Sequence, residues 1–176
     1  MTARTDHAAP LRRARIALAI FTVCLVLSGL TAIPVRWELE TLARWLGAGP
    51  DDAPADHAGL VAFVVRARSA VREGLGRWPL LAYGTDWLAF AHVVLGVLFV
   101  GAIVDPARNR WVITFGMIAC VLVVPWAFAF GHVRGIPVAW RLIDCAFGVF
   151  GIIPLALARR SVVEWEQRKA QVGAPP

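Results

Sequence analysis

Four ionisable side chains lie inside or at the edge of apolar runs that are long enough to cross a membrane. Polar groups in such a place are costly, so they face the interior of a helical bundle and often serve a function. Two come from the run that starts near residue 87 and two from the run that starts near residue 140: Asp86, His92, Arg141 and Asp144. Side chains of these types can bind a small ligand, a lipid headgroup or a partner subunit.

His92 and Asp144 have matched depth in their apolar runs. His92 follows Trp87 by five residues, and Asp144 follows Trp140 by four. At a helical rise of about 1.5 Å per residue, both lie roughly 6–7 Å below the same membrane surface. Groups at equal depth on different helices can meet inside a bundle. We therefore expect an outward-facing polar pocket lined by these two residues together with Asp86 and Arg141.

Each of these four residues also has a purely structural interpretation. Thr85 or Asp86 can cap the N-terminus of their helix, where a carboxylate also suits the helix dipole. Arg141 and Asp144 are three residues apart and can pair on one helix face. His92 can donate a hydrogen bond to Asp144 or to a backbone carbonyl. A structural membrane subunit, whose polar residues only hold its helices together, is therefore an open alternative.

Metal-dependent chemistry is the enzymatic alternative. A membrane hydrolase needs three or more ligands such as His, Asp or Cys, and His92, Asp86, Asp144 and His132 can supply them. His92, His132 and Asp144 are the weak metal candidates, because no HExxH or similar local motif supports them. A haem needs two deep histidines on facing helices, and His132 lies at the rim. The sequence therefore favours a non-enzymatic protein, with no catalytic residue assigned and no cofactor predicted.

The elements that must position these side chains are four apolar runs. Apolar residues make up 59% of the chain and charged residues 17%, whereas soluble domains have about 45–50% and about 25%. A run of about 18 residues gives roughly 27 Å of helix, close to the ~30 Å of a hydrocarbon core. We expect an all-α membrane protein, a single membrane domain over residues 1–176. Its spanning helices are predicted at about 16–33, 87–104, 111–130 and 140–158.

The first apolar run, 16–33, has a competing interpretation as a cleaved signal peptide. A basic stretch precedes the run, and the sequence Leu30-Thr31-Ala32 near its end finishes in a small residue. The run is longer than the h-region of a signal peptide, which has about 7–15 residues. We therefore expect a retained membrane anchor.

The segment 34–85 between the first two runs is more polar and predicts two amphipathic helices. Apolar residues recur at mostly helical spacing over 37–46 and again over 60–75. Helices of this kind lie in the membrane interface or pack over the end of a bundle. Two roles remain open for these helices: ordinary packing against the bundle, or a surface that senses lipid or binds a partner. The tail around Trp165 predicts a further short interfacial helix.

The distribution of basic residues predicts the orientation in the membrane. With four spans, both termini share one side, and that side has ten basic and four acidic residues against eight of each on the other. We expect a multi-pass protein of the inner (plasma) membrane with both termini cytoplasmic. No basic face with interleaved aromatics indicates nucleic-acid binding. The expected partners are the lipid bilayer and a membrane protein, either a different one or a second copy.

Three segments carry a resemblance to known proteins. YGTDWLAFAH (83–92), DPARNRWVITFGMIAC (105–120) and RGIPVAWRLIDCAFG (134–148) resemble recurring segments of small, uncharacterised four-helix bacterial inner-membrane proteins. The resemblance covers about half of the chain, spans two to four with their connectors. It implies the four-helix fold and a bacterial inner membrane, and it implies no activity, cofactor or catalytic residue.

Overall fold

The computed structural model describes residues 8–173, and these residues form helices and connectors without a β-strand. Four helices are long and apolar enough to cross a membrane. They are α2 (Ala9–Leu30), α5 (Ala82–Val104), α6 (Arg110–Val133) and α7 (Val138–Gly173). The prediction of an all-α polytopic membrane protein is confirmed.

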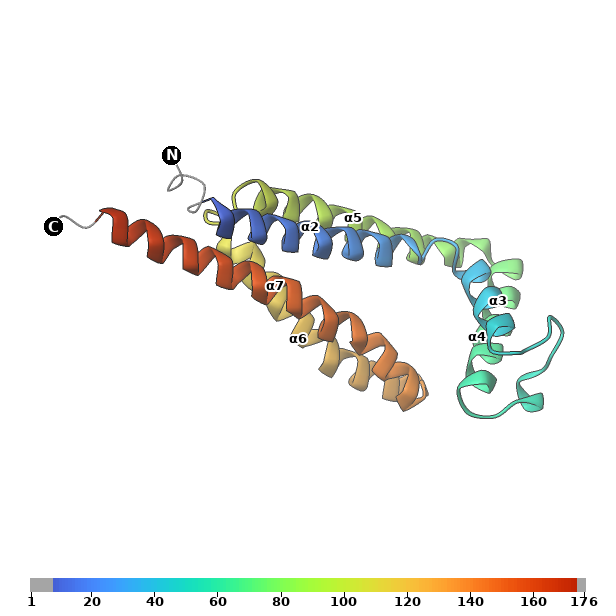
Figure 1. Ribbon diagram of the computed structural model, residues 1–176. Helices are drawn as coiled ribbons and strands as arrows, with labels where there is room; N and C mark the ends of the chain where they lie inside the picture. Colours follow the sequence, from blue (N-terminus) through green and yellow to red (C-terminus); the bar gives the residue numbers. More distant parts are fainter. Residues whose placement is uncertain (1–7, 174–176) are drawn as a thin grey trace.

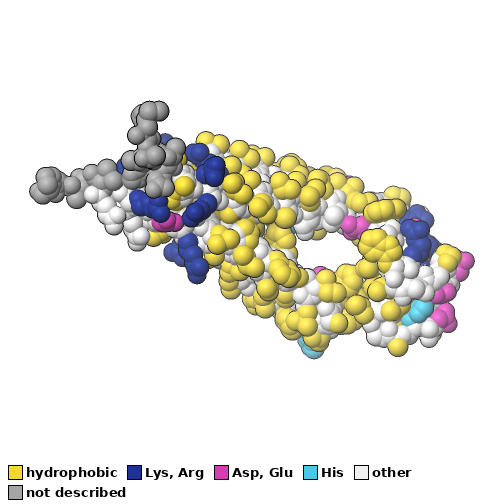
Figure 2. Space-filling model, in the orientation of Figure 1, with side chains coloured by type: hydrophobic (Ala, Val, Ile, Leu, Met, Phe, Trp, Pro, Cys, Tyr) yellow, Lys and Arg dark blue, Asp and Glu magenta, His cyan; other side chains and the backbone are white. Residues whose placement is uncertain are grey.

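The four spanning helices form two antiparallel pairs (Figure 1). Helix α2 lies beside α5, and α6 lies beside α7, while α2 also packs against α7. The pairs meet at the end of the bundle where α2 begins and α7 ends, which we call the terminal end. Toward the opposite end the pairs diverge, and an opening separates them in the space-filling view (Figure 2).

The main core lies where the two pairs meet. Phe21 of α2 contacts Phe99 of α5, with 4.9 Å between ring centroids. Ile113 of α6 and Leu155 of α7 are buried in the same cluster. Lipid tails are as apolar as these side chains, so helices in a bilayer associate through close packing rather than through a hydrophobic driving force. The buried position of Phe21 makes α2 a structural part of the bundle.

Several of the predicted boundaries change in the structure, most of all at the start of α2 and the end of α7. Helix α2 begins at Ala9, seven residues before the predicted span, because Pro10 suits the first turn of a helix and the arginines that follow are good helix formers. The prediction of a separate short helix around Trp165 is wrong. Helix α7 instead continues for 36 residues to Gly173. No glycine or proline interrupts residues 159–171, and Val162 still packs into the main core.

Residues 35–77 form a cap at the end opposite the termini (Figure 1). The cap contains α3 (Val35–Trp45), the short 3-10 helix η1 (Pro54–Asp56) and α4 (Gly59–Arg77), and a second 3-10 helix, η2 (Pro79–Leu81), leads on to α5. The two helices predicted for this segment are therefore present. Four small apolar residues make the buried centre of the cap: Ala43, Ala48, Val64 and Val65.

The cap contacts the α6–α7 pair through an aromatic pair. The rings of Phe63 in α4 and Trp140 in α7 lie 5.3 Å apart between centroids, tilted by 53°. Both rings belong to the rim of the cap core. The cap therefore continues directly from α2 and leads into α5, and it also touches the other pair at the far side of the opening.

Candidate functional site

His92 lies in the interface between α2 and α5. A Cβ built on Gly29 of α2 would come within 2.1 Å of the His92 Cβ, so the histidine packs directly on this glycine. Its Nδ1 lies 2.8 Å from the carbonyl oxygen of Leu88, one turn earlier in α5. A carbonyl oxygen only accepts, so Nδ1 donates to it. His92 thus has the backbone partner that its structural interpretation predicts.

Arg141 and Asp144 do not pair with each other. The Arg141 Nε donates to the carbonyl oxygen of Ile136 at 2.7 Å, and the stem of Arg141 packs over Gly131 of α6. The expected pairing on one helix face is therefore wrong, because the turn between α6 and α7 takes the guanidinium instead. Asp144 is exposed and makes no hydrogen bond or ion pair with another residue that the structure describes.

Asp86 lies on an exposed face near the start of α5. It lines a shallow pocket with three aromatic side chains: Tyr83, Trp87 and Phe90. Helix α5 begins at Ala82, five residues before the predicted span, so Asp86 lies beyond the first turn. The prediction that Thr85 or Asp86 caps this helix is wrong, because the helix begins before both residues.

Among the described residues, the predicted site residues make no polar interaction with one another. Within residues 8–173, no hydrogen bond or ion pair joins any two of them: Asp86, His92, His132, Arg141 and Asp144. The same part of the chain contains no group of three or more His, Cys, Asp or Glu side chains placed to hold a metal ion. The outward-facing polar pocket and its metal-dependent alternative both stay predictions.

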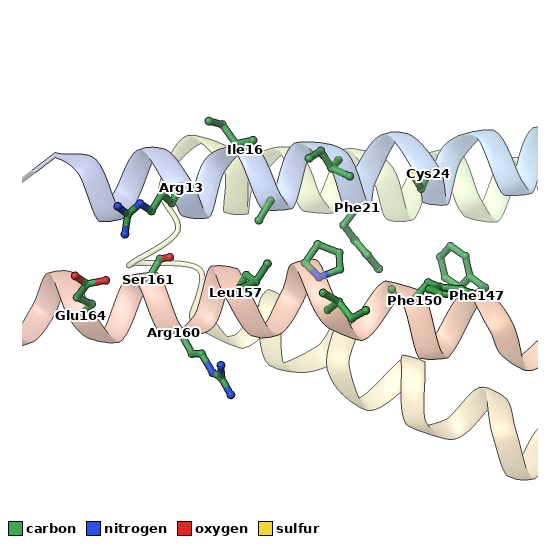
Figure 3. A pocket seen from close by; sticks show the side chains of 15 residues that line it. Arg13, Ile16, Phe21, Cys24, Phe147, Phe150, Leu157, Arg160, Ser161 and Glu164 are labelled. Atoms are coloured by element: carbon green, nitrogen blue, oxygen red, sulfur yellow. The ribbon is translucent and has the colours of Figure 1, made fainter.

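A different cavity lies between α2 and α7 (Figure 3). Its volume is about 680 Å³. Most of the side chains that line it are apolar, and we call it the α2–α7 groove. Its apolar lining comprises Ile16, Ala17, Ile20, Phe21, Cys24, Phe147, Phe150, Gly151, Ile153, Pro154 and Leu157.

Helical spacing explains why these side chains line one groove. The α2 residues recur every three or four positions from Arg13 to Cys24, which places them on one face of the helix. The α7 residues recur in the same way from Phe147 to Glu164. Pro154 lies within this stretch of α7 and has no N–H, so the carbonyl of Phe150 lacks its usual helical donor.

Polar side chains close the groove at the terminal end. Arg13 extends from α2 into the space between the helices, and Ser161 and Glu164 extend toward it from α7 (Figure 3). Arg160 also lines the groove but points to the other side of α7 in this view. Lysine and arginine side chains gather at the same end of the molecule (Figure 2).

The charge at this end of the groove is positive. Neither Arg13 nor Arg160 forms an ion pair with another described residue. Glu164 is already engaged by Arg168, which lies one turn later in α7. The groove therefore combines an apolar channel with a cationic end.

The sequence reasoning did not find this groove. It treated Arg13 and Arg160 only as charges that set the orientation. The spacing of Ile16 and Ile20 does mark one face of α2, but lipid-facing and groove-facing side chains are equally apolar. One feature of the sequence does point to the groove. Arg13 precedes Ile16 by about one helical turn, so an arginine lies at the start of the apolar face that Ile16 and Ile20 mark.

Comparisons with protein-family models, with curated proteins and with solved structures found no match to this chain. A fold hosts many functions, and a function belongs to the side chains of a site. The function is therefore argued from the geometry of the α2–α7 groove.

Proposed function

We propose that the chain is a non-enzymatic membrane protein that binds one lipid-like amphiphile in the α2–α7 groove. The observation that carries this proposal is an apolar groove of about 680 Å³ that ends at arginine side chains with no ion pair to another described residue. Small-molecule sites typically have volumes of about 300–1,000 Å³ and a few polar groups that fix the orientation of the ligand. The groove has both properties.

Along α2, the wall of the groove is about as long as one leaflet of a bilayer. Arg13 and Cys24 mark its two ends on α2. They are eleven residues apart, which is roughly 16 Å of helix at about 1.5 Å per residue. Half of a hydrocarbon core is about 15 Å. An acyl chain that enters beside Arg13 would therefore reach the membrane mid-plane at Cys24.

The shape and chemistry of the groove favour an amphiphile over a partner helix. Spanning helices carry Lys and Arg where they reach the cytoplasm, so a partner helix would bring further cations to the cationic end of the groove. An amphiphile has an apolar body and one polar end, as the groove does. The exposed side chains along the rim, such as Ile16 and Leu157, allow entry sideways from the bilayer.

We extend the proposal to the orientation of the protein. The terminal end carries the excess of basic residues counted along the chain, and the positive-inside rule assigns such an end to the cytoplasm. The amphiphile would then come from the cytoplasmic leaflet of a plasma membrane.

The outward-facing pocket of Asp86, His92, Arg141 and Asp144 is the second candidate site. One observation favours it. Asp144 makes no interaction with another described residue, although it lies only six residues after the start of a spanning helix. An unpaired carboxylate at such a place is costly, which is the usual mark of a site that takes a ligand or partner. The substitution Asp144→Asn, with binding of a purified partner or ligand as the readout, tests this candidate.

A pair of tryptophan substitutions tests the groove. Ile20 and Val23 lie on α2 with nearly equal exposure, 55% and 56%, and only Ile20 lines the groove. Native mass spectrometry of the detergent-purified protein should show one bound lipid on the wild type and on Val23→Trp. Ile20→Trp fills the groove with a large ring, so it should lose the lipid.

Equal lipid occupancy in the two variants would contradict the proposal, as would a wild-type protein that binds no added lipid. Both variants place the same ring on an exposed face of the same helix. A general effect of tryptophan on folding or on detergent binding would therefore appear in both.

A further inference from the structure

Two side chains at the polar end of the α2–α7 groove have hydrogen-bond donors that no acceptor from a described residue satisfies. Arg13 makes no hydrogen bond or ion pair, and the Ser161 hydroxyl makes no hydrogen bond, to any residue that the structure describes. Both side chains extend into the space between α2 and α7 (Figure 3). A guanidinium offers five N–H donors in a planar fork that matches phosphate and carboxylate oxygens. The ligand that completes this end is therefore an anion.

Glu164, the only acid among the described residues that line the groove, does not neutralise this end. Glu164 pairs with Arg168 on its own helix. Arg160 adds a second cation, which also borders a neighbouring cavity of about 400 Å³ together with Arg159 and Gln167. Arg160 lines the groove as well, although its side chain points away from Arg13 in Figure 3.

We propose that the amphiphile is an anionic phospholipid, whose phosphate accepts hydrogen bonds from Arg13 and Ser161. This inference rests on the proposed function. Basic pockets between spanning helices on the cytoplasmic side are a recurring type of site for anionic headgroups. The acyl chain lies along the apolar wall of the groove, and the headgroup stays at the level of the bilayer surface.

The same groups discriminate against zwitterionic lipids. A choline or ethanolamine headgroup brings a cation close to Arg13 and Arg160, and no free carboxylate lines the groove to receive it. Like charges placed together are a common source of binding specificity. An anionic lipid of the same chain length meets no such repulsion.

Native mass spectrometry with two lipids of identical acyl chains, phosphatidylglycerol and phosphatidylcholine, tests the inference on the full chain. The wild type should prefer phosphatidylglycerol by about tenfold, or roughly 1.4 kcal/mol, because only phosphatidylcholine brings a cation to the terminal end. Arg13→Gln should abolish that preference, and Ser161→Ala should weaken the binding of both lipids, since both have a phosphate. Arg160→Gln should reduce the preference less than Arg13→Gln does.

Arg12→Gln is the matched control, because Arg12 is the exposed neighbour of Arg13 on α2 and does not line the groove. The control should keep the full preference. If Arg12→Gln lowers the preference as much as Arg13→Gln, the effect belongs to the general charge of the terminal end, and the inference is wrong.

Inorganic phosphate distinguishes a headgroup from a free anion. Phosphate at the same molar concentration as the lipid should not displace phosphatidylglycerol, because it lacks the acyl chain. Displacement by phosphate alone would overturn the assignment to a lipid.

The two proposals fail in different ways. Lipid binding that depends on Ile20 but shows no preference between headgroups would leave the proposed function in place and overturn the anionic assignment. Lipid binding that survives Ile20→Trp would overturn the proposed function itself.

Discussion

The main core is held together by packing of apolar side chains, whereas the cap depends on hydrogen bonds from a buried arginine. The main core joins apolar side chains from four helices, such as Phe21, Phe99 and Leu155. The centre of the cap is small, and beside it lies Arg68, the one charged side chain that is buried among those the structure describes, with 3% of its surface exposed. The guanidinium of Arg68 donates to the carbonyl oxygens of Gly49 at 2.7 Å and Asp52 at 3.1 Å.

The difference follows from the surroundings of each region. In a bilayer, burial of apolar surface gives helices little reason to associate, so glycines that allow close contact become decisive. The cap buries only a few alanines and valines, too little apolar surface to fix a long loop. Hydrogen bonds hold the loop 46–58 instead, chiefly those from Arg68, with a longer one from Arg72 to the carbonyl oxygen of Pro50. A substitution that disrupts one region should therefore leave the other intact.

The largest effect is expected for Arg68→Met. The change leaves two carbonyl oxygens without their donor, and each unsatisfied group costs about 1–3 kcal/mol. The stability of the cap should fall by about 2–5 kcal/mol, which limited proteolysis of the loop 46–58 would detect. Arg66→Met, an exposed arginine on the same helix, should leave the cleavage rate unchanged. Equal cleavage of both variants would remove Arg68 from this role.

Gly148→Ala should have the next largest effect, and on the main core alone. A Cβ at Gly148 would lie 2.4 Å from the backbone oxygen of Cys120 in α6, so α6 and α7 must move apart. Overpacking of this kind costs about 1–3 kcal/mol, which thermal unfolding in detergent measures. Gly101→Ala is the control, since its Cβ meets nothing closer than 3.9 Å. A loss of stability in the control variant, or faster cleavage of the cap in Gly148→Ala, would break the separation between the regions.

The smallest effect concerns pH and Asp52. The Gly49 N–H donates to the carboxylate of Asp52 at 2.7 Å, and His57 Nε2 lies 2.8 Å from it. The Gly49 hydrogen bond first, and His57 second, hold the pKa of Asp52 below its ordinary value of 3.8. A carboxyl group whose pKa is lowered by folding stabilises the folded cap at pH values above its ordinary pKa. The stabilisation is lost as the pH falls below 3.8 toward the pKa of the folded state.

Cleavage of the loop 46–58 should therefore rise as the pH drops below about 4, with an acid-active protease as the probe. Asp52→Asn should remove this pH dependence, while Asp51→Asn, an exposed neighbour, should keep it. An unchanged pH profile in Asp52→Asn would show that another group carries the effect.

The sequence predicted the fold well because long apolar runs have few alternatives. A run near 18 residues must cross the membrane as a helix, since every backbone polar group needs a partner in lipid. The recurrence of apolar residues in 37–46 and 60–75 located α3 and α4 in the same way. The helix ends were harder to predict, because polar residues continue α2 at its start and α7 at its end.

The candidate site was much harder to predict. The sequence shows which side chains are polar and how deep they lie, but not which helices pair. Helix α5 pairs with α2, and His92 packs on Gly29 of that helix. The groove depends on the same choice of pairs. Its apolar residues look like any lipid-facing residues until the structure places α7 opposite α2.

The most direct test of the central claim is the site at which a bound lipid can be cross-linked. Phosphatidylglycerol with a photoreactive diazirine in its acyl chain would be bound to the purified protein and activated, and the labelled residues mapped by peptide mass spectrometry. The account predicts labels concentrated on Ile20 of α2 and on Phe150 and Leu157 of α7. Equal labelling of exposed residues outside the groove, such as Val97 of α5 and Leu122 of α6, would show that lipid only coats the bundle and would contradict the claim.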